Sequence, residues 1–314
     1  FEPQWLGDLK MQNQNSLIMK SKNDLSEHHQ LVSDLFPSLS PKEAWKKYKL
    51  SDDQVSFFNT YGFISGIKLL DERQVEHLIN ELEEIKNPDH PKHDLFYEFH
   101  TNESKDPNAV LFHSLGHWRI TPGFHDVLWN PAFVVVASQL LGNKAVRFWH
   151  DQLFCKPANH GGVVAWHQDY SYWRRTLPMQ HLTCWVALDD VTRDNGCLYY
   201  VPKSHNWGLL EKPELAGDME GLQQFLTPDQ KRQFAEKVPI EMARGYACFH
   251  HPLMVHGSYE NKSPRPRRAF VLNVFADGTY SDSDGELLKG VPIVRKGKQL
   301  TGKFFPMLFD PKEA

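Results

Sequence analysis

The stretch Trp166-His167-Gln168-Asp169-Tyr170 decides the fold of this chain and points to its chemistry. His167 and Asp169 are two residues apart, and residues at that spacing on a β-strand point to the same face of the sheet. An imidazole and a carboxylate on one face can share a metal ion. His256 ends a short apolar run later in the chain and would complete the two-histidine, one-carboxylate set that holds non-heme Fe(II). The alternative is a solvated polar pair with an unrelated core histidine.

Length and composition favour one β-rich domain that acts on a small molecule. The chain has 314 residues, 40% of them hydrophobic, and about 200 to 250 residues is an ordinary size for one β-barrel domain. Its net charge is −4 with acids and bases interspersed, unlike the basic footprint of a nucleic-acid binder. No stretch approaches the ~20 apolar residues of a membrane span. We expect a small-molecule substrate, no nucleic-acid partner and no membrane span, and leave the oligomeric state open.

The cysteines favour an intracellular location. Each of the four lies in or beside an apolar run, and no two form a CxxC pair: Cys155, Cys184, Cys197 and Cys248. This usage is typical of reduced, buried thiols. We therefore expect a cytoplasmic protein. Because the chain begins at Phe1 rather than Met, an earlier targeting segment stays open as an alternative.

Composition divides the chain into three parts. Residues 1–40 are rich in Gln, Asn, Ser and Lys, which predicts a loose N-terminal arm. Residues 41–276 form the expected domain and begin with a helix, for which Ser40 is the candidate N-cap and Glu43 completes a capping box. Residues 277–314 predict an irregular C-terminal extension. Further helices are predicted from residue 51, over 71–85 and 130–141, and over 227–237 within a polar insertion near 208–237.

Short apolar runs predict the strands of an antiparallel structure. They span residues 145–156, 163–169, 182–188, 197–202, 247–255 and 269–276. The strands at 182–188 and 197–202 are joined through Asn195-Gly196, the strongest short hairpin signal, so we expect these two to pair. With helices on the N-terminal side, the pattern predicts a mainly β, α+β domain: an antiparallel barrel or a double-sheet jelly roll with flanking helices.

Several motifs resemble the phytanoyl-CoA dioxygenase (PhyH) family of Fe(II)- and 2-oxoglutarate-dependent oxygenases. In chain order they are Trp166-His167-Gln168-Asp169, Asp194-Asn195-Gly196-Cys197-Leu198, Val201-Pro202-Lys203-Ser204-His205 and His256-Gly257-Ser258. The resemblance runs from about Leu50 to about Ala276. It implies a double-stranded β-helix, the cupin-like barrel. It also implies that His167, Asp169 and His256 are the catalytic iron ligands.

The resemblance further implies the reaction. Fe(II), the cosubstrate 2-oxoglutarate and O2 would hydroxylate a small-molecule metabolite, with release of succinate and CO2. The substrate does not follow from the family name, because relatives act on acyl-CoA esters and on other small metabolites.

By the same resemblance, Arg267 would bind the distal carboxylate of 2-oxoglutarate. That carboxylate suits a planar, permanently charged partner on the strand after the second histidine. Arg265 and Arg268 lie close by and are the alternatives. If Arg267 points inward with Ala269, then Arg268 points outward, because neighbours on a strand face opposite ways.

The remaining cosubstrate contacts also come from the resemblance. Ser258 would donate its hydroxyl to the distal carboxylate, and Trp185 and Gln152 would line the pocket. In one respect the chain departs from some relatives, which carry a lysine ahead of a Gly-His step. Here the segment is Ser114-Leu115-Gly116-His117, so one cationic contact to 2-oxoglutarate is absent from that place.

Two other classes of function compete with the oxygenase. One is a non-catalytic barrel of the same fold that binds a ligand or a metal. The other is a metal-dependent hydrolase or a cupin-type isomerase, neither of which needs the pair of Arg267 and Ser258. Release of succinate separates the oxygenase from both alternatives.

Overall fold

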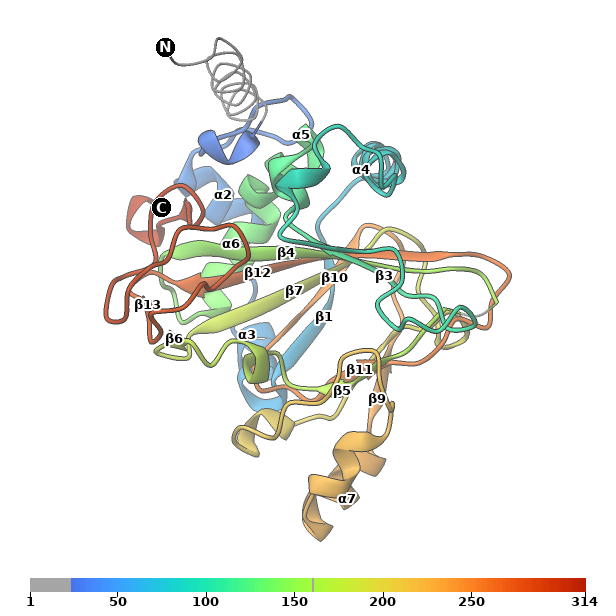
Figure 1. Ribbon diagram of the computed structural model, residues 1–314. Coiled ribbons are helices and arrows are strands. Elements are labelled where there is room, and N and C mark those ends of the chain that lie inside the picture. The colour runs from blue at the N-terminus through green and yellow to red at the C-terminus, as the bar shows by residue number, and fades with distance from the viewer. Residues whose placement is uncertain (1–23, 160) are drawn as a thin grey trace, which may run out of the picture.

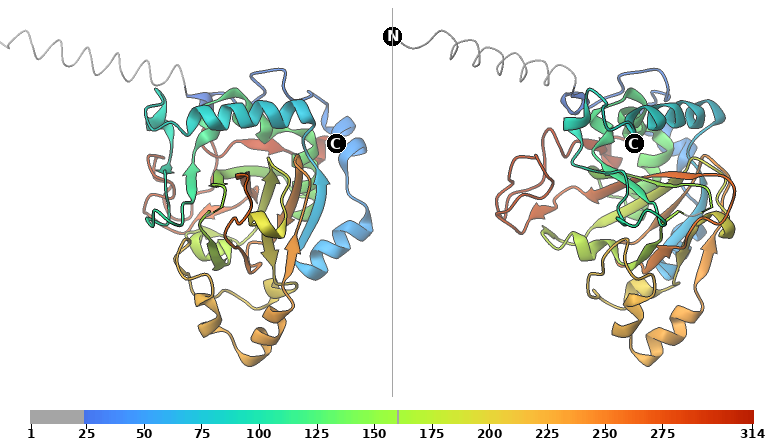
Figure 2. Two further views of the ribbon diagram at one scale, coloured as in Figure 1. Left: turned by 90° about the vertical axis from the view of Figure 1, so that its right-hand side faces the viewer. Right: turned by 45° about the vertical axis from the view of Figure 1, so that its right-hand side comes forward.

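Two β-sheets form the body of the protein, and helices cover the outer side of the larger one (Figure 1). The computed structural model describes residues 24–159 and 161–314. The α-helices of this part are α2 (Pro41–Tyr48), α3 (Asp52–Tyr61), α4 (Glu72–Ile85), α5 (Pro122–Asp126), α6 (Pro131–Leu140) and α7 (Pro228–Ala235). Figure 2 shows α4 above the larger sheet and α7 at the opposite end of the molecule, beyond the smaller sheet.

The larger sheet has eight strands, which pair in antiparallel fashion. The order is β1-β10-β7-β12-β4-β3-β2, with β14 also pairing with β4. The strands are β1 (Phe63–Lys68), β2 (Glu98–His100), β3 (Phe112–Leu115), β4 (Val146–Lys156), β7 (His181–Ala187), β10 (Tyr246–His250), β12 (Arg267–Ala276) and β14 (Met307–Phe309). Because β4 and β12 pair along their whole length, the end of β4 lies opposite the start of β12.

The smaller sheet has the order β5-β11-β8-β9. It packs against the larger sheet, and side chains of both sheets fill the barrel interior between them. Its strands are β5 (Val164–His167), β8 (Leu198–Tyr200), β9 (Val238–Ile240) and β11 (His256–Ser258). A short third pair joins β6 (Thr176–Leu177) to β13 (Tyr280–Ser281). The result is a mainly β jelly roll, a double-stranded β-helix with flanking helices, and the predicted fold class is confirmed.

The predicted hairpin at Asn195-Gly196 is wrong. β7 lies in the larger sheet between β10 and β12, whereas β8 lies in the smaller sheet between β11 and β9. The Asn195 side chain accepts from the backbone N–H of Thr192 (2.8 Å) and donates to the carbonyl oxygen of Asp190 (2.7 Å). Gly196 follows with φ 81°. The dipeptide therefore closes a wider turn that carries the chain from one sheet to the other.

Alternation along β12 separates two hydrophobic cores. Phe270 and Leu272 pack between the larger sheet and the helices, while Ala269 and Val271 belong to a second cluster inside the barrel. Since alternate residues of a strand share a face, Arg267 lies on the barrel side with Ala269 and Val271. The sheet thus directs a guanidinium into the interior.

Residues 24–40, the described part of the expected loose arm, are anchored instead. The backbone N–H of Val32 donates to the Asp126 carboxylate (2.8 Å), and Leu35 and Phe36 are buried in the core beneath the helices. Burial of these two side chains offsets the conformational entropy that the segment loses when it becomes ordered. The polar composition of the segment had suggested that it would bury too little apolar surface for this. The rest of the arm lies outside the described residues.

The C-terminal extension, residues 277–314, has little regular structure but packs closely. β14 pairs with β4 at the edge of the larger sheet. Leu300 and Phe305 are buried in a cluster that also includes Trp149 and Phe275. The extension therefore forms part of the domain wall.

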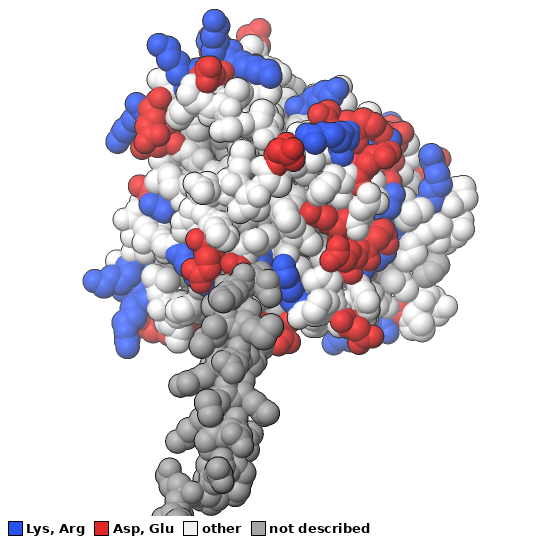
Figure 3. All heavy atoms as spheres, turned by 90° about the horizontal axis from the view of Figure 1, so that it is seen from above, with Lys and Arg blue, Asp and Glu red and all other residues white. Residues whose placement is uncertain are grey.

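The outer face above the helices carries mixed charge. Basic and acidic side chains lie beside one another there rather than in separate patches (Figure 3). Within the described residues, no helix combines the length and the apolar character needed to cross a membrane.

Candidate metal and cosubstrate site

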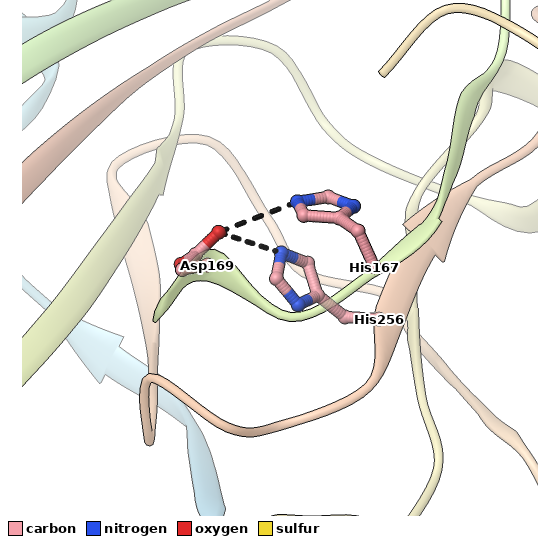
Figure 4. A group of neighbouring side chains, drawn as sticks. All are labelled: His167, Asp169 and His256. Carbon is pink, nitrogen blue, oxygen red and sulfur yellow. Dashed lines mark ion pairs between the residues drawn. The ribbon is translucent and has the colours of Figure 1, made fainter. Parts of the chain in front are cut away.

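Three side chains, two of them from neighbouring strands, converge inside the barrel. His167 ends β5 and His256 begins β11, and the two are direct partners in the antiparallel register. The Nε2 atoms of His167 and His256 lie 3.3 and 3.6 Å from Oδ1 of Asp169 (Figure 4). Potential ligand atoms of the three residues all lie within 4.8 Å of one another. The structure therefore brings the three predicted ligands together.

Asp169 does not lie on the same strand as His167, although the spacing of the two residues suggested that it would. β5 ends at His167, and Asp169 opens a short 3-10 helix, Asp169–Tyr172. The expectation that both side chains share one strand is thus corrected. Because the chain turns immediately after His167, the Asp169 carboxylate still points toward both imidazoles.

Backbone hydrogen bonds fix which nitrogen of each histidine is free. Nδ1 of His167 donates to the carbonyl oxygen of Ala165 (2.7 Å), and Nδ1 of His256 donates to that of Met254 (2.9 Å). A carbonyl can only accept, so the proton of the neutral ring lies on Nδ1. Both Nε2 atoms then present a lone pair toward Asp169, the arrangement in which histidine binds a metal.

The second oxygen of Asp169 is held by the surrounding protein. Oδ2 accepts from the hydroxyl of Thr183 (2.6 Å) and from Nε2 of His250 (2.9 Å). The other nitrogen of His250 contacts the hydroxyl of Tyr200 (2.8 Å). Oδ1 therefore remains directed at the two ligand histidines, and the carboxylate is oriented to offer one oxygen to a shared ion.

Electrostatics favour an anionic carboxylate between neutral imidazoles. Burial alone would raise the pKa of Asp169, but the proximity of His256, His167 and His250 lowers it well below its usual range. Burial, followed by the proximity of His167, lowers the pKa of His256 well below its usual range. One negative carboxylate with two neutral nitrogen donors suits a divalent transition-metal ion, and the donor set fits Fe(II).

A single cavity of about 620 Å³ connects this triad to the other predicted site residues. Its lining includes His167, Asp169, His256, Arg267, Ser258, Trp185 and Gln152. Apart from Asp169, the residues come from β4, β5, β7, β11 and β12, so the curvature of the barrel rather than any local sequence feature gathers them around one space.

Arg267 is a buried cation with unused donors. Its side chain is 1% exposed, and its guanidinium carbon lies 5.4 Å from the ring centroid of Trp185. Nη2 donates to Oγ of Ser258 (3.4 Å), whereas Nε and Nη1 have no partner among the described residues. Burial lowers its pKa to about 10, so it still carries a charge at neutral pH. A guanidinium that faces a cavity with two unused donor atoms is suited to a carboxylate ligand.

The neighbouring arginines point elsewhere. Arg268 binds the Asp189 carboxylate through Nε (3.0 Å) and Nη2 (2.7 Å). Arg265 is exposed and precedes β12. Of the three predicted candidates, the structure places Arg267 alone among the cavity residues.

Ser258 and Gln152 line the cavity but already have partners. The Ser258 hydroxyl donates to the carbonyl oxygen of Gly196 (2.8 Å) and accepts from Nζ of Lys156 (2.7 Å). Gln152 accepts from the side chain of Asn273 (3.1 Å). The hydroxyl that was expected to meet 2-oxoglutarate is therefore committed to the protein in this structure.

Four polar residues around the site were not anticipated: Thr183, His250, Asn273 and Lys156. Each makes its contact across strands that are distant in sequence. Lys156 ends an alternating run, and its charge at an apolar strand end was the one available signal. The other three gave none, because single polar residues within strands are common.

Comparison with known proteins places this site in a family. Residues 58–269 match the sequence model of the family described as Phytanoyl-CoA dioxygenase (PhyH). The chain is 28% identical over 255 residues to the phytanoyl-CoA dioxygenase of Arabidopsis thaliana, with 72% of this chain and 88% of that protein covered. It is 27% identical over 242 residues to the methylphosphonate hydroxylase of Gimesia maris, with 73% and 83% covered.

A solved structure shares the fold. The epimerase SnoN, in complex with Fe3+, alpha ketoglutarate and nogalamycin RO, aligns with a TM-score of 0.67 at 20% identity, covering 82% of this chain and 98% of that chain. The predicted fold and the predicted enzyme class, an iron- and 2-oxoglutarate-dependent dioxygenase, are confirmed by these comparisons. Because the family match spans residues 58–269, well over half of its length, the chain belongs to the phytanoyl-CoA dioxygenase (PhyH) family.

Proposed function

We propose that this protein hydroxylates a small molecule in the cavity between its two sheets and consumes 2-oxoglutarate in doing so. One observation carries the proposal. The cavity that contains the His167, Asp169 and His256 triad also contains the buried guanidinium of Arg267, whose Nε and Nη1 have no partner among the described residues. A metal-binding set and an anion-binding group in one cavity match the two ends of 2-oxoglutarate.

In this proposal His167, Asp169 and His256 hold Fe(II) through two Nε2 atoms and Oδ1. Iron with 2-oxoglutarate and O2 supplies the oxidant for a substrate C–H bond, and succinate and CO2 are released. The protein contributes orientation. The backbone carbonyls behind both histidines fix their tautomers, and Thr183 and His250 fix the carboxylate.

Arg267 binds the distal carboxylate of 2-oxoglutarate. Its position inside the barrel, with Trp185 stacked beside it, excludes water and strengthens a charge-assisted, bidentate pair. Gln152 and Ser258 complete the wall around the cosubstrate. The residues thus fix one end of 2-oxoglutarate and leave its oxo acid end toward the triad.

The substrate occupies the remaining part of the cavity. Its wall combines aromatic residues that follow the triad, Tyr172 and Trp173, with residues 212–216 of the insertion and with Leu287 and Leu288 of the C-terminal extension. The relatives differ in substrate, as the names methylphosphonate hydroxylase and phytanoyl-CoA dioxygenase show. The substrate of this chain is therefore set by the residues of these walls rather than by the family name.

The four cysteines support an intracellular, cytoplasmic enzyme. Cys155, Cys184, Cys197 and Cys248 are free and buried, as the sequence predicted, and reduced thiols are typical of cytosolic proteins. Fractionation of cells that express the tagged chain tests this location.

A metabolite screen scored by succinate release tests the proposed reaction. Purified protein with Fe(II), ascorbate, 2-oxoglutarate and O2 should release succinate above its uncoupled background with at least one substrate, and mass spectrometry should show a gain of one oxygen in that substrate. His167→Ala protein is the matched blank. A product formed without succinate would favour the hydrolase or isomerase. Ligand binding with neither product nor succinate would favour the non-catalytic barrel.

A further inference from the structure

Lys156 is a second buried basic residue, and it lies next to Arg267 and Ser258 of the proposed cosubstrate pocket. It ends β4 directly opposite Arg267, the first residue of β12. Its side chain is fully buried. The amine donates to Oγ of Ser258 (2.7 Å), to the carbonyl oxygen of Ser258 (3.2 Å) and to the carbonyl oxygen of Tyr259. An ammonium has three donors, and three acceptors surround this one.

The surrounding backbone leaves room for this side chain. A Cβ added to Gly161 would lie 2.3 Å from Cβ of Lys156, and one added to Gly196 would lie 3.3 Å from its Nζ. Gly196 also has φ 81°, a conformation that favours glycine. The turns that contain Gly161 and Gly196 therefore pack closely around Lys156. The buried position of this side chain is thus part of the fold.

Lys156 and Arg267 lie side by side without a directly paired carboxylate. Among the described residues, no carboxylate forms an ion pair with either group, and two donors of Arg267 are unused. Burial, and then the charge of Arg267, lower the pKa of Lys156 well below its usual range, whereas the Glu260 carboxylate raises it. The three acceptors around the amine favour its protonated form, and an anion bound beside the two cations would offset the cost of burying them.

We propose that Lys156 is a positioning residue for 2-oxoglutarate: it holds Ser258 beside Arg267 and adds a second positive charge behind the distal carboxylate. This inference rests on the proposed function.

A purely structural role is the competing explanation. The same three hydrogen bonds tie the end of β4 to the turn after β11, and that tie alone would explain a buried lysine. The two roles differ in what they require of the ligand. A structural tie affects every 2-oxo acid equally, whereas a positioning charge affects only those with a distal carboxylate.

The test combines truncation of the ligand with substitution of the lysine. Binding of 2-oxoglutarate and of 2-oxovalerate, which has a methyl group in place of the distal carboxylate, is measured by calorimetry on Mn(II)-loaded protein without O2. The variants are Lys156→Met and Lys156→Gln, with Lys46→Met on the exposed side of α2 as the matched control. Gln retains donors for the carbonyl oxygens without the charge, so it serves if Met proves too disruptive to fold. Melting curves verify folding.

We expect both Lys156 variants to bind 2-oxoglutarate about tenfold more weakly and 2-oxovalerate within about twofold of the unmodified protein, since a buried charge pair is lost only with the former. Equal weakening of both ligands, or no weakening of either, would overturn the inference. Arg267→Ala separates this from a failure of the proposed function. If even the unmodified protein and Arg267→Ala treat the two ligands alike, the distal carboxylate is not bound here at all.

Discussion

His167 and His256 are direct partners across β5 and β11, and their ring centroids are 4.2 Å apart. The antiparallel ladder therefore sets the spacing of two of the three proposed ligands. Asp169 lies beyond the end of β5, and its orientation depends on side-chain hydrogen bonds instead. The triad thus combines a rigid pair with a third ligand that separate residues hold in place.

Loss of any one triad residue should eliminate the metal centre. Anaerobic protein with Fe(II) and 2-oxoglutarate is expected to show a weak visible charge-transfer band, and His167→Ala, Asp169→Ala and His256→Ala should each abolish it, because three donors are the minimum for this centre. Absorption spectroscopy under nitrogen measures the band. His77→Ala, a substitution on the exposed side of α4, should leave it unchanged. A band that persists in all three variants would refute the ligand assignment.

Weakening the support of Asp169 should have a graded effect. Thr183→Val keeps the shape of the side chain but removes the hydroxyl that donates to Oδ2. Residues that orient metal ligands typically contribute about 10- to 100-fold to metal affinity, so we expect Mn(II) affinity to fall by about tenfold or more. Calorimetric titration checks this, with the exposed Thr301→Val as control. An unchanged affinity would mean that His250 alone suffices to orient the carboxylate.

The sequence predicted many of the strands and helices because these follow from local periodicity and from capping residues. The capping box at Ser40, the helix over 71–85 and the strand ending at Lys156 are examples. The Asn195-Gly196 hairpin failed for the opposite reason. A turn signal is local, but the choice of sheet for each flanking strand is decided by contacts with β10, β11 and β12 that lie far along the chain.

The site shows the same division between local and distant information. His167 and Asp169 carry their spacing in the sequence, His256 was a candidate because it ends a short apolar run, and resemblance to a family supplied Arg267. The contacts of Thr183, His250 and Lys156 depend on strand register across the barrel, which no single segment encodes. Their roles follow only from the contacts that these residues make in the folded barrel.

Of the three clustered arginines, Arg267 should dominate cosubstrate affinity. Removing one partner of a buried charge pair costs roughly 2 to 5 kcal/mol, so Arg267→Ala should raise the 2-oxoglutarate requirement by about 30-fold or more. Arg268→Ala should change it only a few-fold, because that side chain binds Asp189. The exposed Arg265→Ala should behave similarly. Titration of succinate release against 2-oxoglutarate measures all three. A severe defect in Arg268→Ala with a silent Arg267→Ala would show that a different anchor is used.

Gln168, between two proposed ligands, should control the insertion that covers the cavity. Its side chain donates to the carbonyl oxygens of Gly208 and Leu253 (2.9 Å each) and accepts from the N–H of Leu210 (2.8 Å). Each such bond contributes about 1 kcal/mol, so Gln168→Leu should speed proteolytic cleavage within residues 208–219 about tenfold or more.

Limited proteolysis with mass spectrometry locates the cut. The exposed Gln224→Leu serves as control, and affinity for 2-oxoglutarate should stay within about twofold, since Arg267 is untouched. Unchanged cleavage in Gln168→Leu would mean that Tyr172, whose hydroxyl donates to the carbonyl oxygen of Pro213 (2.9 Å), is the main anchor of the insertion.

The C-terminal extension should determine which substrates enter. Leu287 lines the cavity together with Trp173, and the guanidinium of Arg175 donates to its carbonyl oxygen (3.1 Å), which fixes the segment against the wall. Leu287→Trp adds bulk to a space of about 620 Å³. Leu287 and Arg267, both in the described part of the chain, make no hydrogen bond with each other, so we direct the test at the substrate part of the cavity. We therefore expect substrate-dependent succinate release to fall at least about tenfold, while the affinity for 2-oxoglutarate stays unchanged, because filling a preformed pocket excludes a ligand of matched shape.

Ile293→Trp, at a position that is 56% exposed, is the matched control. Equal loss of substrate turnover and cosubstrate binding in Leu287→Trp would indicate a general distortion of the barrel, and full activity would place the substrate elsewhere in the cavity.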